Sequence, residues 1–269
     1  MKVTEADILA IKEEIDGMKK YRELSLPMET IADLANANGQ NCKNLKELKK
    51  VVREKLHAII APYLGDPDYA AITAEFDALD KTDMAALEEF CRRQLEIHVS
   101  TRERCPDLAG VYRYVFEHTG LPSSVADFAC GIQPIALPFM GLKKGSVYRA
   151  YDINGPRVEF LNHFILSLGY GGGAFSRDIL ADTPTEHTDV ALFFKEAHRF
   201  ENRRKGCVEG FIERMNADVV VVSLPATNVD KQHTLSAHYY GTIENAAEKH
   251  GWQIEKGEYL GEVFYFIRK

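Results

Sequence analysis

Two short segments of the chain combine residue types that suit the binding of a nucleoside. Residues 125–128 form an apolar run that leads into a turn at Gly131, and residues 147–151 form a second run that ends on Asp152. Glycine at a strand-to-helix turn lets the backbone approach a bound molecule, because it carries no Cβ. A carboxylate at the tip of the next strand accepts hydrogen bonds from a pair of ribose hydroxyls. The alternative is that Gly131 only turns the chain and Asp152 only caps a helix.

The glycine content of the turn narrows the class of cofactor. A dinucleotide fingerprint uses three glycines to bring the backbone against a pyrophosphate, whereas this turn contains Gly131 alone. S-adenosylmethionine (SAM) carries an adenosine, a sulfonium and an amino acid but no phosphate, so it does not require the other two glycines. The turn is therefore suited to SAM.

Further candidate residues follow the other expected strands, since an open α/β sheet binds ligands beyond the carboxyl ends of its strands. Asp178 would accept a hydrogen bond from the adenine amino group, with Ile153 and Ile179 packing on the faces of the ring. Asp178 could equally cap a helix. Phe194 and Lys195 end the fourth strand, where the lysine is either an ordinary strand-end residue or faces a bound anion.

The segment at residues 98–104 reads His-Val-Ser-Thr-Arg-Glu-Arg and is rich in polar groups. Arg102 could pair bidentately with the carboxylate of the cofactor, because the guanidinium fork matches carboxylate geometry. The alternative is a helix end capped by Ser100 or Thr101, with Glu103 and the two arginines exchanging ion pairs.

The first 119 residues show helical periodicity almost throughout. Thr4, followed by acids, is typical of a helix start, and Pro27 opens a second helix that ends near Gly39. Further helices are expected at residues 45–59, 68–79 and 83–97.

Strand-like and helix-like segments alternate from about residue 122 onward. This alternation predicts a parallel sheet covered on both faces, and the tail predicts an antiparallel hairpin. The expected strands are 125–128, 147–151, 174–176, 190–194 and 219–223, the expected helices 156–168, 201–215 and 236–250, and the expected hairpin 252–259 with 262–267. We therefore expect an α/β fold: an all-helical domain over residues 1–104 and a Rossmann-like class I SAM-dependent methyltransferase domain over residues 105–269.

The bulk composition excludes several classes of protein. A net charge of −7 argues against a protein that coats nucleic acid indiscriminately. No apolar run approaches the roughly 18 residues that cross a bilayer, and the N-terminus is polar. The five cysteines are scattered without a Cys-x-x-Cys pair, which argues against a disulfide framework and against a zinc site. A cytoplasmic location without membrane or metal is expected.

Two basic clusters stand out against this acidic background. The first consists of Lys43, Lys46, Lys49, Lys50, Arg53 and Lys55, and the second of Arg199, Arg203, Arg204 and Lys205. Either cluster could be a solvated helix face or a local surface for nucleic acid.

Three motifs together resemble a known family. They are His-Val-Ser-Thr-Arg-Glu-Arg at 98–104, Asp-Phe-Ala-Cys-Gly-Ile-Gln-Pro-Ile-Ala-Leu at 127–137 and Ala-Tyr-Asp-Ile at 150–153. They resemble the Arm/Rmt-type aminoglycoside-resistance methyltransferases, which modify 16S ribosomal RNA. Weaker similarity occurs at residues 19–24, 55–57, 194–195, 223–225 and 261–265, so the resemblance spans nearly the whole chain.

The resemblance implies SAM-dependent methylation of guanine N7 at position 1405 in the decoding site of the 30S subunit, and with it aminoglycoside resistance. It implies that Arg102 holds the methionine carboxylate, that Asp152 takes the ribose and that Asp178 takes the adenine. The full set of implied cofactor contacts is His98, Arg102, Ala129, Gly131, Asp152, Ile153, Asp178, Ile179 and Phe194. Lys195 is the candidate catalytic residue, and the candidate RNA contacts are Lys46, Lys49, Lys50, Arg53, Arg203 and Arg204.

The chain departs from that family in three places. Ala129 stands where many members have glycine, which is a mild change if the backbone there is unstrained. Residues 196–198, Glu-Ala-His, replace an apolar run, and the loop at 226–238 lacks the Gly-rich basic character of the family. The last two departures lie where the target RNA is expected to approach.

Guanine N7 has a free lone pair, so its methylation needs no general base. Residues 193–196, Phe-Phe-Lys-Glu, accordingly lack the Asn/Asp-Pro-Pro-aromatic motif of enzymes that methylate exocyclic amines. We expect in-line alignment of a flipped base to provide most of the rate enhancement, with Lys195 compensating charge on the base. Two alternatives remain open: a methyltransferase for another RNA nucleotide or a small molecule, and a catalytically silent protein that binds RNA or SAM.

Overall fold

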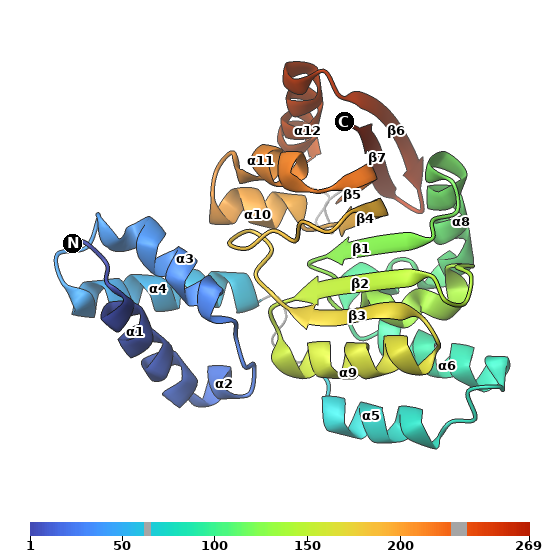
Figure 1. The fold of residues 1–269 in the computed structure, drawn as a ribbon, viewed down its shortest axis with the longest axis horizontal. Helices are drawn as coiled ribbons and strands as arrows, with labels where there is room; N and C mark the ends of the chain where they lie inside the picture. The colour runs from blue at the N-terminus through green and yellow to red at the C-terminus, as the bar shows by residue number, and fades with distance from the viewer. Residues whose placement is uncertain (62–65, 227–235) are drawn as a thin grey trace.

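The computed structural model describes residues 1–61, 66–226 and 236–269. The chain forms a helical lobe at its N-terminus and a larger lobe built on a seven-stranded sheet (Figure 1). The helical lobe lies beyond one end of the sheet, on the side to which the parallel strands in the middle of the sheet point (Figure 1). The carboxyl ends of those strands therefore face the helical lobe.

The helical lobe consists of α1 (Glu5–Gly17), α2 (Lys19–Arg22), α3 (Met28–Gly39) and α4 (Leu45–Ile60). The first helix begins at Thr4, whose hydroxyl accepts from the Asp7 N–H while the Asp7 carboxylate accepts from the Thr4 N–H. This reciprocal capping box satisfies two backbone donors at the helix start. The apolar faces pack into a core of their own, made of Ile11, Ile15, Tyr21, Leu26, Ile31, Leu34, Ala35, Cys42, Leu48, Val52, Leu56 and Ile60.

The sheet has the strand order β3-β2-β1-β4-β5-β7-β6. Its strands are β1 (Ser124–Phe128), β2 (Val147–Asp152), β3 (Gly171–Ser176), β4 (Thr188–Phe194), β5 (Ala217–Pro225), β6 (Gln253–Tyr259) and β7 (Glu262–Arg268). The first five strands pair in parallel, and β7 is antiparallel to both β5 and β6. The predicted parallel sheet with a closing hairpin is therefore confirmed.

Helices cover both faces of the sheet. Successive residues of a strand point to opposite sides, so the apolar strands present a hydrophobic face on each side for helices to pack on. In β4, Val190, Leu192 and Phe194 belong to one hydrophobic core, whereas Ala191 and Phe193 belong to the other. The first core packs against α5 (Tyr69–Ala78), α6 (Met84–Leu95), α8 (Leu108–Thr119) and α9 (Gly155–Ser167). The second packs against α10 (Ala197–Arg203), α11 (Cys207–Arg214) and α12 (Ser236–His250).

Two expected elements differ in detail from the structure. The helix expected at 201–215 is divided into α10 and α11, because Gly206 adopts a left-handed backbone with φ of 75° between them. The strand expected at 174–176 begins earlier, at Gly171, since its first three residues are glycines that carry no strand signal. Neither difference changes the topology of the sheet.

The hydrophobic cores divide the chain at a different place from the predicted domain boundary at residue 104. Phe76 in α5 and Phe90 in α6 are fully buried in the core of the sheet lobe. The helical lobe with its own core therefore ends with α4. Residues 66–104 were expected with the helical domain, but where they are described as α5 and α6 they pack with the sheet.

Several features concern the chain as a whole. All five cysteines are free, and four of them are buried. Among the described helices, none is long and apolar enough to cross a membrane. Within the same residues, no group of three or more His, Cys, Asp or Glu side chains is placed to hold a metal ion.

The two lobes meet at a tight seam beside β2. The Gly155 N–H donates to the Leu24 carbonyl at 2.8 Å, and Ile153 packs against the core of the helical lobe. A Cβ at position 155 would lie 2.7 Å from the Ser25 Cβ and 3.3 Å from the Leu24 carbonyl oxygen. The absence of a side chain at Gly155 is thus what allows the loop between α2 and α3 to approach the start of α9.

Gly155→Ala is expected to lower the free energy of unfolding by about 1–3 kcal/mol, because the added methyl group overpacks this seam. Gly17→Ala is the matched control, since a Cβ there meets no atom within 4 Å. Urea unfolding of both variants measures the difference. A Gly155→Ala protein as stable as the wild type would contradict this account of the seam.

Candidate cofactor and RNA site

A cavity of about 410 Å³ lies between the helical lobe and the carboxyl ends of the strands. Its volume lies within the range of small-molecule sites, and its position is where open α/β sheets bind ligands. The helical lobe contributes apolar side chains, and the sheet contributes polar ones. Lining residues of the first kind include Leu24, Leu26, Leu34, Ile59 and Ile60, and lining residues of the second kind include Asp152, Arg157, Asp178 and Arg203.

The turn after β1 is tied directly to the tip of β2. Ala129 and Gly131 both have φ of 53°, in the left-handed region. The Cys130 N–H donates to the Tyr151 carbonyl at 3.0 Å, and the Gly131 N–H donates to Asp152 Oδ2 at 3.0 Å. The turn and the carboxylate that the sequence singled out therefore form one unit.

Asp152 is 8% exposed and is held on several sides. Its Oδ1 accepts from the Asn154 N–H at 2.9 Å, and its Oδ2 accepts from Arg157 Nη1 at 3.0 Å as well as from Gly131. Arg157 lies in the first turn of α9. Because the carboxylate is fixed by these contacts and still borders the cavity, it can present acceptor lone pairs to a ligand.

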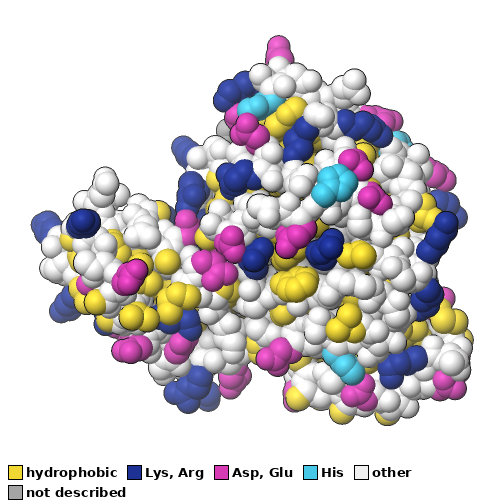
Figure 2. All heavy atoms as spheres, viewed as in Figure 1, with side chains coloured by type: hydrophobic (Ala, Val, Ile, Leu, Met, Phe, Trp, Pro, Cys, Tyr) yellow, Lys and Arg dark blue, Asp and Glu magenta, His cyan; other side chains and the backbone are white. Residues whose placement is uncertain are grey.

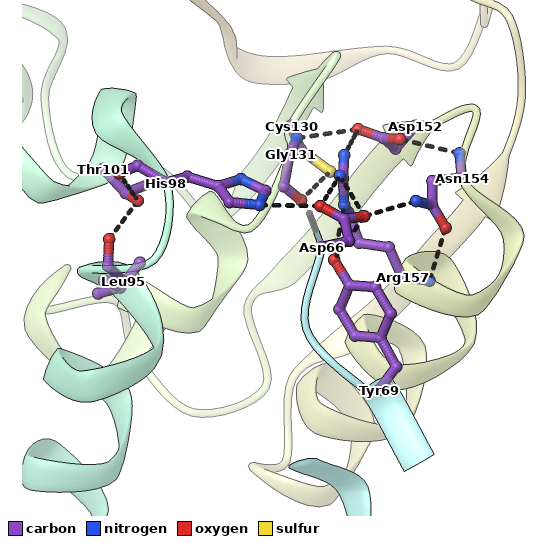
Figure 3. A network of polar contacts seen from close by, with 10 residues as sticks. All are labelled: Asp66, Tyr69, Leu95, His98, Thr101, Cys130, Gly131, Asp152, Asn154 and Arg157. Carbon is purple, nitrogen blue, oxygen red and sulfur yellow. Dashed lines mark hydrogen bonds and ion pairs between the residues drawn. The ribbon is translucent and has the colours of Figure 1, made fainter. Parts of the chain in front are cut away.

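A buried polar network extends behind Asp152 (Figure 3). The second nitrogen of the Arg157 fork, Nη2, donates to both oxygens of Asp66 at 2.8 and 2.7 Å, and Nε donates to the Tyr69 hydroxyl at 3.0 Å. His98 Nε2 lies 2.9 Å from Asp66 Oδ1. Burial acts to raise the pKa of Asp66, but the hydrogen bond from His98 and the charge of Arg157 outweigh it and lower that pKa.

Asp178 is 1% exposed and lies in the described turn after β3, where no helix follows for it to cap, so its role towards adenine stays a prediction. Its Oδ1 accepts from the Leu180 N–H at 3.2 Å, and the residue also lines the cavity. Arg203 forms a fork on it, with Nη1 3.0 Å from Oδ1 and Nη2 2.7 Å from Oδ2. The same Nη2 lies 2.8 Å from Asp33 Oδ2 in α3.

A second buried network lies on the other side of the cavity. Arg104 donates to Glu262 through Nε and Nη2 at 2.9 and 2.5 Å, and to Gln133 Oε1 through Nη1 at 2.6 Å. Its guanidinium carbon lies 4.7 Å from the centre of the Phe194 ring. Lys195 Nζ lies 2.5 Å from Glu103 and 3.3 Å from Glu262, so two carboxylates neutralise its charge.

The structure brings most of the predicted cofactor residues together. Those that line the cavity are His98, Ala129, Gly131, Asp152, Ile153, Asp178, Ile179 and Phe194. Arg102, at the end of α7 (Val99–Arg102), is exposed and does not belong to the lining. Lys195 is buried beside the cavity and is likewise outside the lining. The roles of all these residues in binding and catalysis stay predictions.

The predicted RNA contacts divide into two groups. Lys46 and Lys50 in α4 are exposed, whereas Lys49 and Arg53 pair with Glu14 of α1 at 3.0 and 2.9 Å. In the second cluster, Arg203 is buried between Asp33 and Asp178, and Arg204 is half exposed and also pairs with Asp33. Figure 2 shows basic and acidic side chains interspersed over this face of the molecule.

The positions where the sequence departs from the resembling family border the cavity. Glu196 and His198 line it, and burial lowers the pKa of His198 to about 4, so that its ring is neutral at pH 7. In the loop at 226–238, residues 227–235 lie outside the described part of the chain. The expectation that this loop approaches the target RNA therefore stays a prediction.

The residues of the site that were not predicted from the sequence include Arg104, Arg157 and Asp66. Arg157 carries a signal that could have identified it, because a cation in the first turn of a helix opposes the helix dipole. Arg104 stands in the same motif as Arg102, and nothing in the motif distinguishes the buried arginine from the exposed one. Asp66 lies in an irregular segment without any periodicity.

A buried carboxyl in β1, Asp127, has a titration that can be measured. It accepts from the Tyr148 hydroxyl at 2.6 Å and from Gln133 Nε2 at 3.0 Å. Burial raises the pKa of Asp127 to about 7, against a hydrogen-bonding contribution from Tyr148 and Gln133 that acts to lower it. A carboxyl whose folded pKa is raised stabilises the fold below about pH 4, and this contribution is lost as the pH rises to about 7.

Asp127→Asn removes this titration. The free energy of unfolding of the variant, relative to wild type, is expected to rise by about 2.5 kcal/mol between pH 5 and pH 8. Asp189→Asn is the control, because hydrogen bonds from Ser123 and Ser124 outweigh burial and lower the pKa of Asp189, which places its titration below this window. Urea unfolding across the pH series measures both, and a flat difference for Asp127→Asn would contradict the raised pKa.

Ala129→Gly is expected to stabilise the fold by about 0.5–1 kcal/mol. A left-handed backbone at a non-glycine residue costs roughly 1–2 kcal/mol, and the greater freedom of glycine in the unfolded chain offsets about 0.5–1 kcal/mol of that gain. Ala126→Gly, within β1, is the control and is expected to destabilise. Thermal unfolding compares them; destabilisation by both variants would show that Ala129 is unstrained.

Comparisons with known proteins agree with this geometry. The model of the ribosomal RNA methyltransferase family FmrO matches residues 18–267. The 16S rRNA (guanine(1405)-N(7))-methyltransferase of Micromonospora echinospora is 32% identical over 240 residues, which cover 88% of this chain and 87% of that protein. The protein of the same name from Frankia casuarinae is 29% identical over 269 residues, covering 96% and 93% of the two chains.

Solved structures share the fold over nearly the whole chain. The 16S rRNA methylase RmtB superposes with a TM-score of 0.78 at 24% identity, covering 97% of this chain and 98% of that one. RmtF, solved in complex with S-adenosyl-L-homocysteine, also gives 0.78, at 23% identity and with 99% and 100% coverage. The Rossmann-like methyltransferase fold with a helical N-terminal region is thereby confirmed. The family match and the sequence identity together show that the chain belongs to the FmrO family of ribosomal RNA methyltransferases.

Proposed function

We propose that this protein is a SAM-dependent methyltransferase that modifies N7 of guanine 1405 in the 16S rRNA of the 30S subunit. The observation that carries the proposal is the pair of buried carboxylates, Asp152 and Asp178, at the tips of adjacent strands in a cavity roofed by the helical lobe. Relatives that share most of the chain are named for this reaction. A ribosomal substrate also implies work in the cytoplasm and aminoglycoside resistance in the host.

The residues of the cavity fit an adenosine-containing cofactor. Asp152 offers acceptors for the two ribose hydroxyls, and Asp178 offers one for the adenine amino group. Ile153 and Ile179 line the cavity next to these two acids and supply apolar surface for the ring. Arg102 is the proposed partner of the cofactor carboxylate, although it lies outside the cavity lining; Arg104 lines the cavity, but its Nε, Nη1 and Nη2 already donate to Glu262 and Gln133.

When bound, SAM supplies an electrophilic methyl group on a sulfonium. The chain's own residues have to hold the guanine so that N7 faces that methyl in line, and no residue has to remove a proton. Lys195 is the proposed group that compensates charge on the base. Its partner Glu103 has a side chain that is 41% exposed, whereas Glu262 is buried, so Glu103 is the contact that an approaching phosphate or base can displace.

The helical lobe is the proposed docking surface for the folded RNA. Lys46 and Lys50 are its freely accessible cations in the predicted set, and Lys49 and Arg53 stand beside them on α4. Contacts of this kind to phosphates give affinity without reading sequence. The choice of nucleotide would then come from the shape of the cavity, whose lining includes Glu196 and His198.

Incubating 30S subunits with SAM and the protein, followed by borohydride–aniline cleavage and primer extension, tests the proposal. A stop at guanine 1405 is expected with the wild type. Asp152→Ala should abolish both SAM binding and methylation, because it removes the acceptors for the ribose. A stop at another nucleotide would reassign the target, and binding to 30S without methyl transfer would identify a silent RNA-binding protein.

The double charge reversal of Lys46 and Lys50 to glutamate separates RNA from small-molecule substrates. It should lower methylation of 30S subunits by at least tenfold at physiological salt, because like charges then face the phosphates, while SAM affinity is unchanged. Lys143→Glu is the matched control, since this exposed lysine precedes β2 at the opposite end of the sheet. Full methylation by the double variant would contradict docking through α4.

A further inference from the structure

The two carboxylates at the cavity share an arrangement that the proposed chemistry does not require. Each faces a buried arginine, and each arginine reaches on to a second aspartate from the N-terminal part of the chain. Asp152 is linked through Arg157 to Asp66, and Asp178 is linked through Arg203 to Asp33. We call these two sets the ribose bridge and the adenine bridge.

The inner and outer aspartates of each bridge differ in their relation to the cavity. Asp152, Asp178 and both arginines line it, whereas Asp33 and Asp66 are outside the lining formed by the described residues. Asp33 belongs to α3 of the helical lobe, and Asp66 lies in the connection from that lobe to α5. Asp33 reaches the lining through Arg203, and Asp66 reaches it through Arg157 and also through His98 and Asn154, which line the cavity as well.

The guanidinium fork explains how the outer acids can act. A guanidinium that faces a single carboxylate donates to it through two nitrogens, in a bidentate pair. In the ribose bridge, Asp66 takes all of Nη2, so Asp152 receives Nη1 only. In the adenine bridge, Asp33 shares Nη2 with Asp178. Asp66 thus keeps Arg157 from closing on both oxygens of Asp152, whose free lone pairs the cofactor would use. Arg203 already closes on both oxygens of Asp178, so Asp33 acts there only by drawing part of the Nη2 contact to itself.

The charges of the bridges also suit the proposed ligand. The side chains of Arg157 and Arg203 are 3% and 9% exposed, so their charges are balanced locally. The ribose bridge sets one cation between two carboxylates, which leaves one net negative charge beside the cavity, whereas in the adenine bridge Arg204 also pairs with Asp33 and balances the second acid. SAM carries one net positive charge, and its demethylated product carries none.

We propose that Arg157 and Arg203 are positioning residues through which Asp66 and Asp33 set the affinity for the cofactor. The proposal rests on the proposed function, since it takes SAM as the occupant of the cavity. It makes the helical lobe part of the cofactor site as well as the RNA-docking surface. By linkage, a cofactor held between the bridges and an RNA that fixes the lobe favour each other's binding.

Calorimetric titration of SAM into Asp33→Asn and Asp66→Asn tests the proposal. Each variant is expected to raise the Kd for SAM at least fivefold. The matched controls are Asp16→Asn, whose partner is Lys12 within α1, and Asp77→Asn, whose partner is His163 on the sheet lobe. Both controls should stay within twofold of wild type, because neither acid approaches the bridges.

Steady-state methylation of 30S subunits distinguishes positioning from a general loss of structure. Asp33→Asn and Asp66→Asn should raise the KM for SAM while kcat at saturating SAM stays within twofold. If Asp66→Asn does not fold, Asp66→Glu replaces it, because the longer acid keeps the charge but displaces the arginine.

The two bridges can also be told apart. Wild type should prefer S-adenosylhomocysteine over S-inosylhomocysteine, in which an oxygen replaces the adenine amino group. Asp33→Asn should lose part of this preference, since its bridge ends at Asp178, the proposed acceptor for the adenine amino group. Asp66→Asn should retain the preference, since its bridge ends at Asp152, the proposed acceptor for the ribose.

Unchanged SAM affinity in both variants, with a lowered melting temperature of the ligand-free protein, would overturn the proposal and leave the bridges a purely structural role. An equal fall in kcat and in kcat/KM would overturn it as well. Wild-type protein that neither binds SAM nor methylates 30S subunits would refute the proposed function itself, so the two failures are distinguishable.

Discussion

The structure depends on one constraint: a carboxylate at the end of β2 must be buried, charged and still able to accept from a ligand. Burial of an ion without partners is prohibitively unfavourable. Asp152 meets the constraint with the backbone N–H of Gly131 and Asn154 and with one nitrogen of Arg157. Each of these contacts fixes a neighbouring element, so the β1 turn, the start of α9 and the connection at Asp66 are all arranged around a single side chain.

The seam between the lobes follows from the same constraint. The loop that carries Asp152 continues into Ile153, which packs on the helical core, and Gly155, which bonds to Leu24. The loop proposed to hold the cofactor and the lobe interface are therefore consecutive residues of one segment. Three non-glycine residues beside the cavity, Ser25, Ala129 and Lys195, have a strained backbone with positive φ. Strained residues of this kind persist where the surrounding packing over-determines them.

Much of this could be predicted from the sequence, for physical reasons that differ between elements. Strands such as β4 and β5 were predictable because their apolar runs are buried on both sides, and Asp152 because it ends the apolar run of β2. Asp178 was found as the acid two residues after the short β3, whose glycine start carries no strand signal. That α5 and α6 pack with the sheet lobe could not be predicted, because an amphipathic helix has the same periodicity whether it packs on other helices or on a sheet. Arg203 was assigned to RNA because a run of basic residues does not reveal the acids that neutralise its members, here Asp178 and Asp33, which lie 25 and 170 positions from Arg203 in the chain.

The division of the hydrophobic cores has a consequence for how such enzymes can diversify. The helical lobe up to α4 has an interior of its own, while α5 and α6 share theirs with the sheet. The natural unit of exchange between relatives is thus the first four helices, and a junction placed near residue 104 would leave Phe76 and Phe90 without the surface they were selected to fit. With the roles proposed for the lobe and the bridges, a transplanted lobe would also have to bring aspartates that match the host's arginines, so target choice and donor affinity would be inherited together.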